Sequence, residues 1–149
     1  MSNRRHAQDP VDKTFCFGGF HLILGSMGVK VLVADDAPFI REVLQQILTE
    51  NGFQVVGEAE DGKSAIRLAQ ETDPDLILMD LVMPHMSGIE ATKEILKIRP
   101  HQKIIACSTM DQESLMMAAI DAGCMHYVVK PFKKEELIGI LKKAGGKAP

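Results

Sequence analysis

From Lys30 onward, short apolar runs alternate with stretches in which apolar residues repeat at helical spacing. The runs occupy residues 31–34, 53–59, 76–79, 104–107 and 127–129. Short, nearly continuous apolar runs are typical of strands that are buried on both faces of a parallel sheet. The alternation therefore predicts five β-α units in one domain.

The stretch after the first run has the clearest helical pattern. Its apolar residues fall at i, i+3, i+4, i+7 and i+8, namely Ile40, Val43, Leu44, Ile47 and Leu48. Asp36 is the expected N-cap, and Asn51-Gly52 is the expected end. Further helices are expected over residues 64–70, 88–98, 112–122 and 133–144. Strands and helices in this order predict a doubly wound α/β fold with right-handed crossovers and the flavodoxin-like strand order 2-1-3-4-5.

Polar residues follow four of the five predicted strands. They are Asp35-Asp36, Asp80, Ser108-Thr109 and Lys130-Pro131. The carboxyl ends of parallel strands meet at one edge of the sheet, so these residues should converge there. Clustered carboxylates repel one another unless a cation compensates, and Mg²⁺ is the hard divalent ion that carboxylate oxygens suit.

Lys130 and Ser108 would complement an anion beside these carboxylates. Carboxylates, Mg²⁺, a lysine and a hydroxyl together suit phosphoryl transfer, with Asp80 as the nucleophile. The Lys130-Pro131 bond is expected to be cis. Taken singly, each residue has a simpler interpretation: Asp36, Ser108 and Thr109 could cap helices, and Lys130 could be a surface charge. Complementary groups at four strand ends favour the functional interpretation.

Composition narrows the class of protein further. The chain has 149 residues, 46% of them apolar and 25% charged, with a net charge of −3. These values predict a cytoplasmic globular domain that binds neither nucleic acid nor membrane. The three cysteines form no C-x-x-C pair, which argues against a zinc site or a disulfide scaffold. Cys107 and Cys124 are expected to lie in the core.

The first 27 residues differ from the rest. Arg4, Arg5 and the apolar stretch 15–24 suggest a signal peptide, but Asp9 and Asp12 argue against one. We expect residues 1–27 to be a poorly ordered extension, residues 28–145 to form the domain, and residues 146–149 to be a tail.

Four motifs together resemble the receiver domain of two-component response regulators. They are residues 32–36, 78–84, 86–88 and 127–132, and the resemblance runs from about residue 30 to residue 143. Within the family the chain is similar to stand-alone, CheY-like receivers of the chemotaxis type, particularly in residues 107–112. Thr109 departs from the family, which commonly has alanine there, as does Ser87, where aspartate is frequent.

The resemblance implies a role for each site residue. Asp80 would accept a phosphoryl group from a CheA-like histidine kinase, while Ser108 would be the switch hydroxyl and Lys130 its charge partner. Tyr127 would be the switch aromatic. Magnesium would be held by Asp35, Asp36, Asp80 and the backbone carbonyl of Val82.

The implied function is a monomeric signalling switch that binds a target after phosphorylation, the flagellar motor switch being the leading candidate. The surface that changes would lie on the fourth helix, the fifth strand and the fifth helix. Because the chain stops after the fifth predicted helix, no output domain is expected. A phosphorelay intermediate and a fragment of a larger DNA-binding regulator remain the alternatives.

Two other functions known for this kind of fold, one enzymatic and one ligand-binding, are disfavoured by the sequence. A haloacid-dehalogenase-like phosphatase would need a second acid where Val82 stands, so only slow self-dephosphorylation is expected. A nucleotide- or flavin-binding protein would need a glycine-rich loop after the first strand, which the sequence lacks.

Overall fold

A single five-stranded parallel sheet organises the domain. The computed structural model describes residues 14–17, 20–23 and 28–145. The sheet strands are β3 (Lys30–Ala34), β4 (Gln54–Ala59), β5 (Leu76–Met79), β6 (Lys103–Ser108) and β7 (His126–Val129). Their spatial order is β4-β3-β5-β6-β7, and every neighbouring pair is parallel. Counted along the domain this is the order 2-1-3-4-5, so the predicted fold is confirmed.

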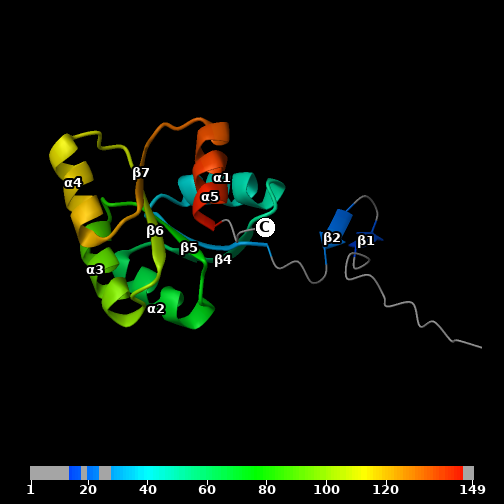
Figure 1. Cartoon of the computed structure of the whole chain (residues 1–149), viewed down its shortest axis with the longest axis horizontal. Helices are drawn as coiled ribbons and strands as arrows, with labels where there is room; N and C mark the ends of the chain where they lie inside the picture. The colour runs from blue at the N-terminus through cyan, green and yellow to red at the C-terminus, as the bar shows by residue number, and fades with distance from the viewer. Residues whose placement is uncertain (1–13, 18–19, 24–27, 146–149) are drawn as a thin grey trace, which may run out of the picture.

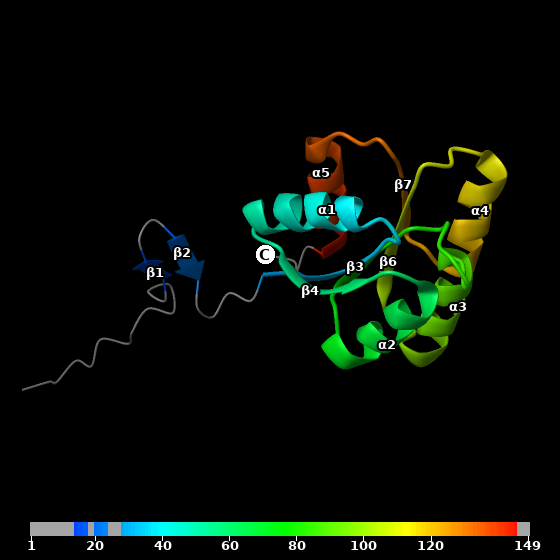
Figure 2. The same ribbon diagram turned by 180° about the vertical axis from the view of Figure 1, so that it is seen from behind.

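Five helices cover the two faces of this sheet. They are α1 (Pro38–Glu50), α2 (Gly62–Thr72), α3 (Gly88–Ile98), α4 (Glu113–Ala122) and α5 (Lys134–Gly145). Helices α1 and α5 lie on one face, and α2, α3 and α4 lie on the other (Figures 1 and 2).

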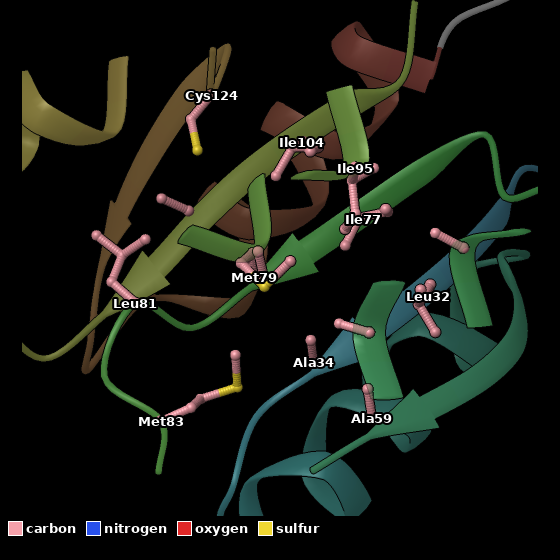
Figure 3. Close-up of a cluster of buried hydrophobic side chains, with 14 of the residues drawn as sticks. Leu32, Ala34, Ala59, Ile77, Met79, Leu81, Met83, Ile95, Ile104 and Cys124 are labelled. Atoms are coloured by element: carbon pink, nitrogen blue, oxygen red, sulfur yellow. The ribbon is translucent and has the colours of Figure 1, made fainter. Parts of the chain in front are cut away.

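The apolar strands fill two cores because successive side chains point to opposite faces. In β3 and β5, Leu32, Ala34, Ile77 and Met79 face α2, α3 and α4 (Figure 3). Their neighbours Val31, Val33, Leu76 and Leu78 face α1 and α5. Both faces of the sheet are therefore shielded from solvent, which explains why the strands are continuous apolar runs in the sequence.

Two of the cysteines are part of these cores, as predicted. Cys124 lies in the core under α3 and α4, and Cys107 lies in the core under α1 and α5. Burial raises the pKa of the Cys107 thiol to about 12. Both thiols are free. With this pKa the Cys107 thiol stays protonated at neutral pH, so it is not a reactive nucleophile.

The helix ends correct two sequence predictions. Asp36 does not cap α1: the N-cap is Ala37, whose backbone N–H donates to Asp35 Oδ1 at 2.9 Å. Helix α2 begins at Gly62, two residues before the predicted start, because Asp61 and Ser64 form a capping box. Gln112 stands at the N-cap of α4, so neither Ser108 nor Thr109 caps that helix.

The N-terminal segment contains a strand pair that was not predicted. β1 (Thr14–Phe17) and β2 (Phe20–Ile23) pair in antiparallel fashion. The remainder of the expected extension 1–27, apart from these strands, and the expected tail 146–149 lie outside the described residues. Among the helices of the described part, none is both long and apolar enough to cross a membrane.

Candidate functional site

Three strands of the sheet, β3, β5 and β7, deliver acidic and basic side chains to the same edge. Asp35 and Asp36 follow β3, Asp80 follows β5, and Lys130 follows β7. One carboxylate oxygen from each of the three aspartates lies within 4.8 Å of the others. The convergence expected from parallel strands is therefore present, and Lys130 forms ion pairs with Asp35 and Asp80.

The two buried carboxylates have fixed orientations. Asp35 Oδ1 accepts the N–H of Ala37, and Asp35 Oδ2 accepts a hydrogen bond from the Lys130 ammonium. Asp80 Oδ1 accepts the N–H of Val82 at 3.1 Å, and Asp80 Oδ2 lies 3.5 Å from Lys130 Nζ. Each carboxylate is thus held by one backbone amide and one shared cation.

The electrostatics of the site are unbalanced. Burial raises the pKa of Asp80, and the charges of Asp35 and Asp36 raise it further, although Lys130 and the Val82 amide act in the opposite direction. Burial alone would lower the pKa of Lys130, but its hydrogen bond to Asp35 and the charge of Asp80 outweigh that effect and the pKa rises. The Lys130 ammonium therefore contacts two of the three carboxylates, those of Asp35 and Asp80.

This donor set fits a magnesium ion. Mg²⁺ prefers oxygen ligands and binds through a few carboxylates while keeping several waters. Asp35 and Asp80 are buried, whereas Asp36 is exposed, so the cluster is open to solvent on one side. The N–H of Val82 is used by Asp80. Metal binding by the Val82 carbonyl stays a prediction.

The loop between β5 and α3 is packed directly against Asp80. A Cβ atom at residue 88 would collide with the carbonyl oxygen of Asp80, so only glycine fits there. The N–H of Gly88 donates to the carbonyl of Leu81 at 3.0 Å. Ser87 caps α3 in a capping box with Glu90, so serine has a structural function at this position.

The two expected switch residues hold the same stretch of backbone. Ser108 is fully buried at the end of β6, and its hydroxyl accepts the N–H of Met110 at 3.3 Å. Tyr127 in β7 donates its hydroxyl hydrogen to the carbonyl of Met110 at 2.6 Å. Both side chains therefore fix the start of the connection to α4. Thr109, which lies between Ser108 and Met110 in the chain, is exposed.

Sequence reasoning missed one residue beside the site. Arg41, in the first turn of α1, donates from Nη1 to the carbonyl of Asp35 at 2.6 Å. Its Nε lies 3.6 Å from Glu58 Oε1 in β4. A basic residue one helical turn into α1, shortly after an acidic pair, is the signal that could have identified it.

Comparison with known proteins assigns the family. Residues 31–142 match the response regulator receiver domain. The chain is 45% identical over 117 residues to chemotaxis protein CheY of Thermotoga maritima, covering 78% of this chain and 98% of that protein. The CheX-CheY-BeF3-Mg+2 complex from Borrelia burgdorferi contains a chain that superimposes with a TM-score of 0.76 at 27% identity, covering 79% of this chain and 90% of that chain. The chain is also similar to the receiver domain of sensor histidine kinase PA1611 from Pseudomonas aeruginosa, with a TM-score of 0.74 at 32% identity. The alignment covers 80% of this chain and 99% of that domain, whose structure is described with a magnesium ion coordinated in the active-site cleft. The chain belongs to the response regulator receiver family, and its similarity to CheY extends over nearly the whole length of that relative.

Proposed function

We propose that this chain is a chemotaxis response regulator that accepts a phosphoryl group on Asp80 from a histidine kinase and then binds a downstream protein. The observation that carries the proposal is the buried Asp80 carboxylate, which faces Lys130 and lies within 4.8 Å of two further carboxylates. The alignment with nearly the whole of a CheY protein supports the assignment to chemotaxis.

The transfer step uses Asp80 as the nucleophile. An Asp80 carboxylate oxygen attacks the phosphorus of a phosphohistidine, an O–P bond forms, the P–N bond breaks, and the imidazole leaves. Lys130, already 3.5 Å from Asp80, would pair with a phosphoryl oxygen. Asp35, Asp36 and Asp80 would hold the Mg²⁺ ion, which when bound neutralises negative charge on the phosphoryl oxygens. With Val82 at the position of a second acid, hydrolysis of the product should be slow.

The response would travel through the Met110 backbone. A phosphoryl group on Asp80 would offer new acceptor oxygens to the Ser108 hydroxyl, which now accepts the N–H of Met110. Movement of Ser108 would then disturb the residue to which Tyr127 is bonded. Phosphorylation would favour one of two packings of this segment, which is a population shift.

A surface suited to a partner lies beside this segment. Large apolar side chains on α4 and around β7 are exposed, namely Met117, Ile120, Met125 and Val129. Met117 is 53% exposed, and methionine adapts readily to partner surfaces. We place the downstream target here. A CheA-like kinase as donor, the flagellar motor switch as target, a cytoplasmic location and a monomeric state complete the proposal.

The test is the intact mass of the protein after incubation with acetyl phosphate. We expect the wild type to gain one phosphoryl group with Mg²⁺ and none with excess EDTA, and Asp80→Asn to gain none. Asp121→Asn is the matched control, because Asp121 is an exposed aspartate on α4. Equal gain by Asp80→Asn and the wild type, or gain without a divalent cation, would refute the proposal.

A further inference from the structure

We infer that Arg41 is a positioning residue that fixes the Asp35-Asp36 turn in the geometry needed for magnesium binding. The inference rests on the proposed magnesium site. It concerns a residue outside the acidic cluster, which acts through the backbone of Asp35 rather than by touching the ion.

Arg41 connects three elements around this turn. It belongs to α1, it donates to the carbonyl of Asp35 at the end of β3, and it lies 3.6 Å from Glu58 in β4. The side chain is only 16% exposed, so its guanidinium is largely withdrawn from solvent. A planar guanidinium can serve both acceptors at once because its donors point in fixed, separate directions.

The other contacts of Asp35 make this hydrogen bond consequential. The N–H of Asp35 donates to the carbonyl of Ala59 at 2.9 Å, and its side chain binds Ala37 and Lys130. Arg41 is the contact that holds the Asp35 carbonyl, from which the chain continues to Asp36. Asp36 is exposed. Because it follows Asp35 directly, a shift of the Asp35 carbonyl would move the Asp36 carboxylate as well.

The charge of Arg41 and its proposed positioning role predict opposite changes in Mg²⁺ affinity when the residue is replaced. A cation that binds the Asp35 backbone, beside the acidic cluster, should weaken Mg²⁺ binding by repulsion, so its removal on electrostatic grounds alone should tighten binding. If Arg41 instead positions the turn, its removal should weaken binding despite the lost repulsion. Loss of groups that orient metal ligands commonly costs 10-fold or more in affinity, on the order of the effect expected here.

The experiment is calorimetric titration of the unphosphorylated full chain with MgCl₂, using the wild type, Arg41→Gln, Arg41→Lys and Arg67→Gln. Arg67→Gln is the matched control because it removes the same charge from an exposed pair with Glu71 on α2. Melting curves of the same samples ensure that each titration is done on folded protein. If Arg41→Gln does not fold, Arg41→Lys carries the test, since it keeps the charge but loses the forked geometry.

We expect Arg41→Gln to bind Mg²⁺ about tenfold more weakly than the wild type, Arg41→Lys to be intermediate, and Arg67→Gln to be unchanged. Unchanged or tighter binding by folded Arg41→Gln, or full affinity in Arg41→Lys when Arg41→Gln does not fold, would overturn the inference alone. A wild type that binds no Mg²⁺ would instead overturn the metal site of the proposed function, and the positioning role with it.

Discussion

Asp80 combines two properties that are costly to a folded protein and useful to a phosphoacceptor. Its carboxylate is buried, and it lies close to two other carboxylates with one lysine as the shared counter-charge. Burial is the main reason that its pKa is raised. In the absence of a divalent cation, the ionised side chain therefore destabilises the native state.

Asp80→Asn should consequently raise the melting temperature in metal-free buffer near neutral pH. Because the folded pKa is raised, the penalty for ionised Asp80 is fully present above that pKa. It disappears as the pH falls toward the ordinary value of 3.8. The advantage of Asp80→Asn should thus shrink on acidification, and also when Mg²⁺ is added. Thermal melts at several pH values test this, with Asp121→Asn as control. A lower melting temperature for Asp80→Asn near neutral pH would contradict it.

The side-chain partnerships of the site were the least predictable part. Parallel strands that end at one edge predicted that Asp35, Asp80 and Lys130 would meet. The sequence did not indicate that Lys130 would pair with Asp35 as well as with Asp80, or that Arg41 would hold the Asp35 carbonyl. Such contacts depend on distances between atoms on separate elements, which hydrophobic periodicity does not encode.

At the scale of elements, the loop from β5 to α3 ties the phosphoacceptor to the helix layer. The backbone of Gly88, the first residue of α3, approaches the Asp80 carbonyl so closely that no side chain can be placed between them. The same loop packs against the start of α2, where a Cβ at Gly62 would meet the Met86 side chain. The position of Asp80 therefore depends on the packing of this loop.

Gly88→Ala should lower the free energy of unfolding by about 3 kcal/mol, because relieving the collision requires the backbone to move. It should also slow phosphoryl gain from acetyl phosphate, since Asp80 is displaced. Gly139→Ala in α5 is the matched control: a Cβ there meets nothing within 4 Å, and alanine should stabilise the helix by about 1 kcal/mol. Urea denaturation measures both changes. A neutral Gly88→Ala variant would show that this contact is not needed.

The elements themselves were largely predictable, and the errors have physical causes. All five parallel strands and all five helices appear at the expected places, because apolar periodicity reports burial. Asp36 was wrongly expected to cap α1, since its neighbour Asp35 binds the Ala37 amide instead. Strands β1 and β2 were missed, because apolar residues interrupted by two glycines did not show a clear period.

At the scale of the whole molecule, the acidic site and the apolar surface of α4 and β7 are joined through one short segment. Ser108 is the last residue of β6, beside the site. The backbone of Met110 is hydrogen-bonded to the side chains of both Ser108 and Tyr127. The face covered by α1 and α5 has a separate core. Phosphorylation of Asp80 should therefore change the structure more on the side of α4 and β7 than on the face with the separate core.

Amide chemical shifts from NMR test this asymmetry. On phosphorylation we expect the largest changes, beyond the site itself, in residues 108–129, and small changes in the second half of α1, which packs in the separate core. The same donor added to Asp80→Asn is the control and should change little. Changes confined to the residues around Asp35 and Asp80, with α4 and β7 unaffected, would show that phosphorylation does not reach the proposed partner surface.

The most direct test of Asp80 as phosphoacceptor is to identify the modified residue chemically. Borohydride reduces an aspartyl phosphate to homoserine with release of phosphate, leaving a permanent mark that peptide mass spectrometry can locate. After incubation with acetyl phosphate and Mg²⁺, we expect homoserine at position 80 and at no other aspartate. Homoserine at position 35 or 36, or phosphorylated protein without homoserine at 80, would contradict the assignment.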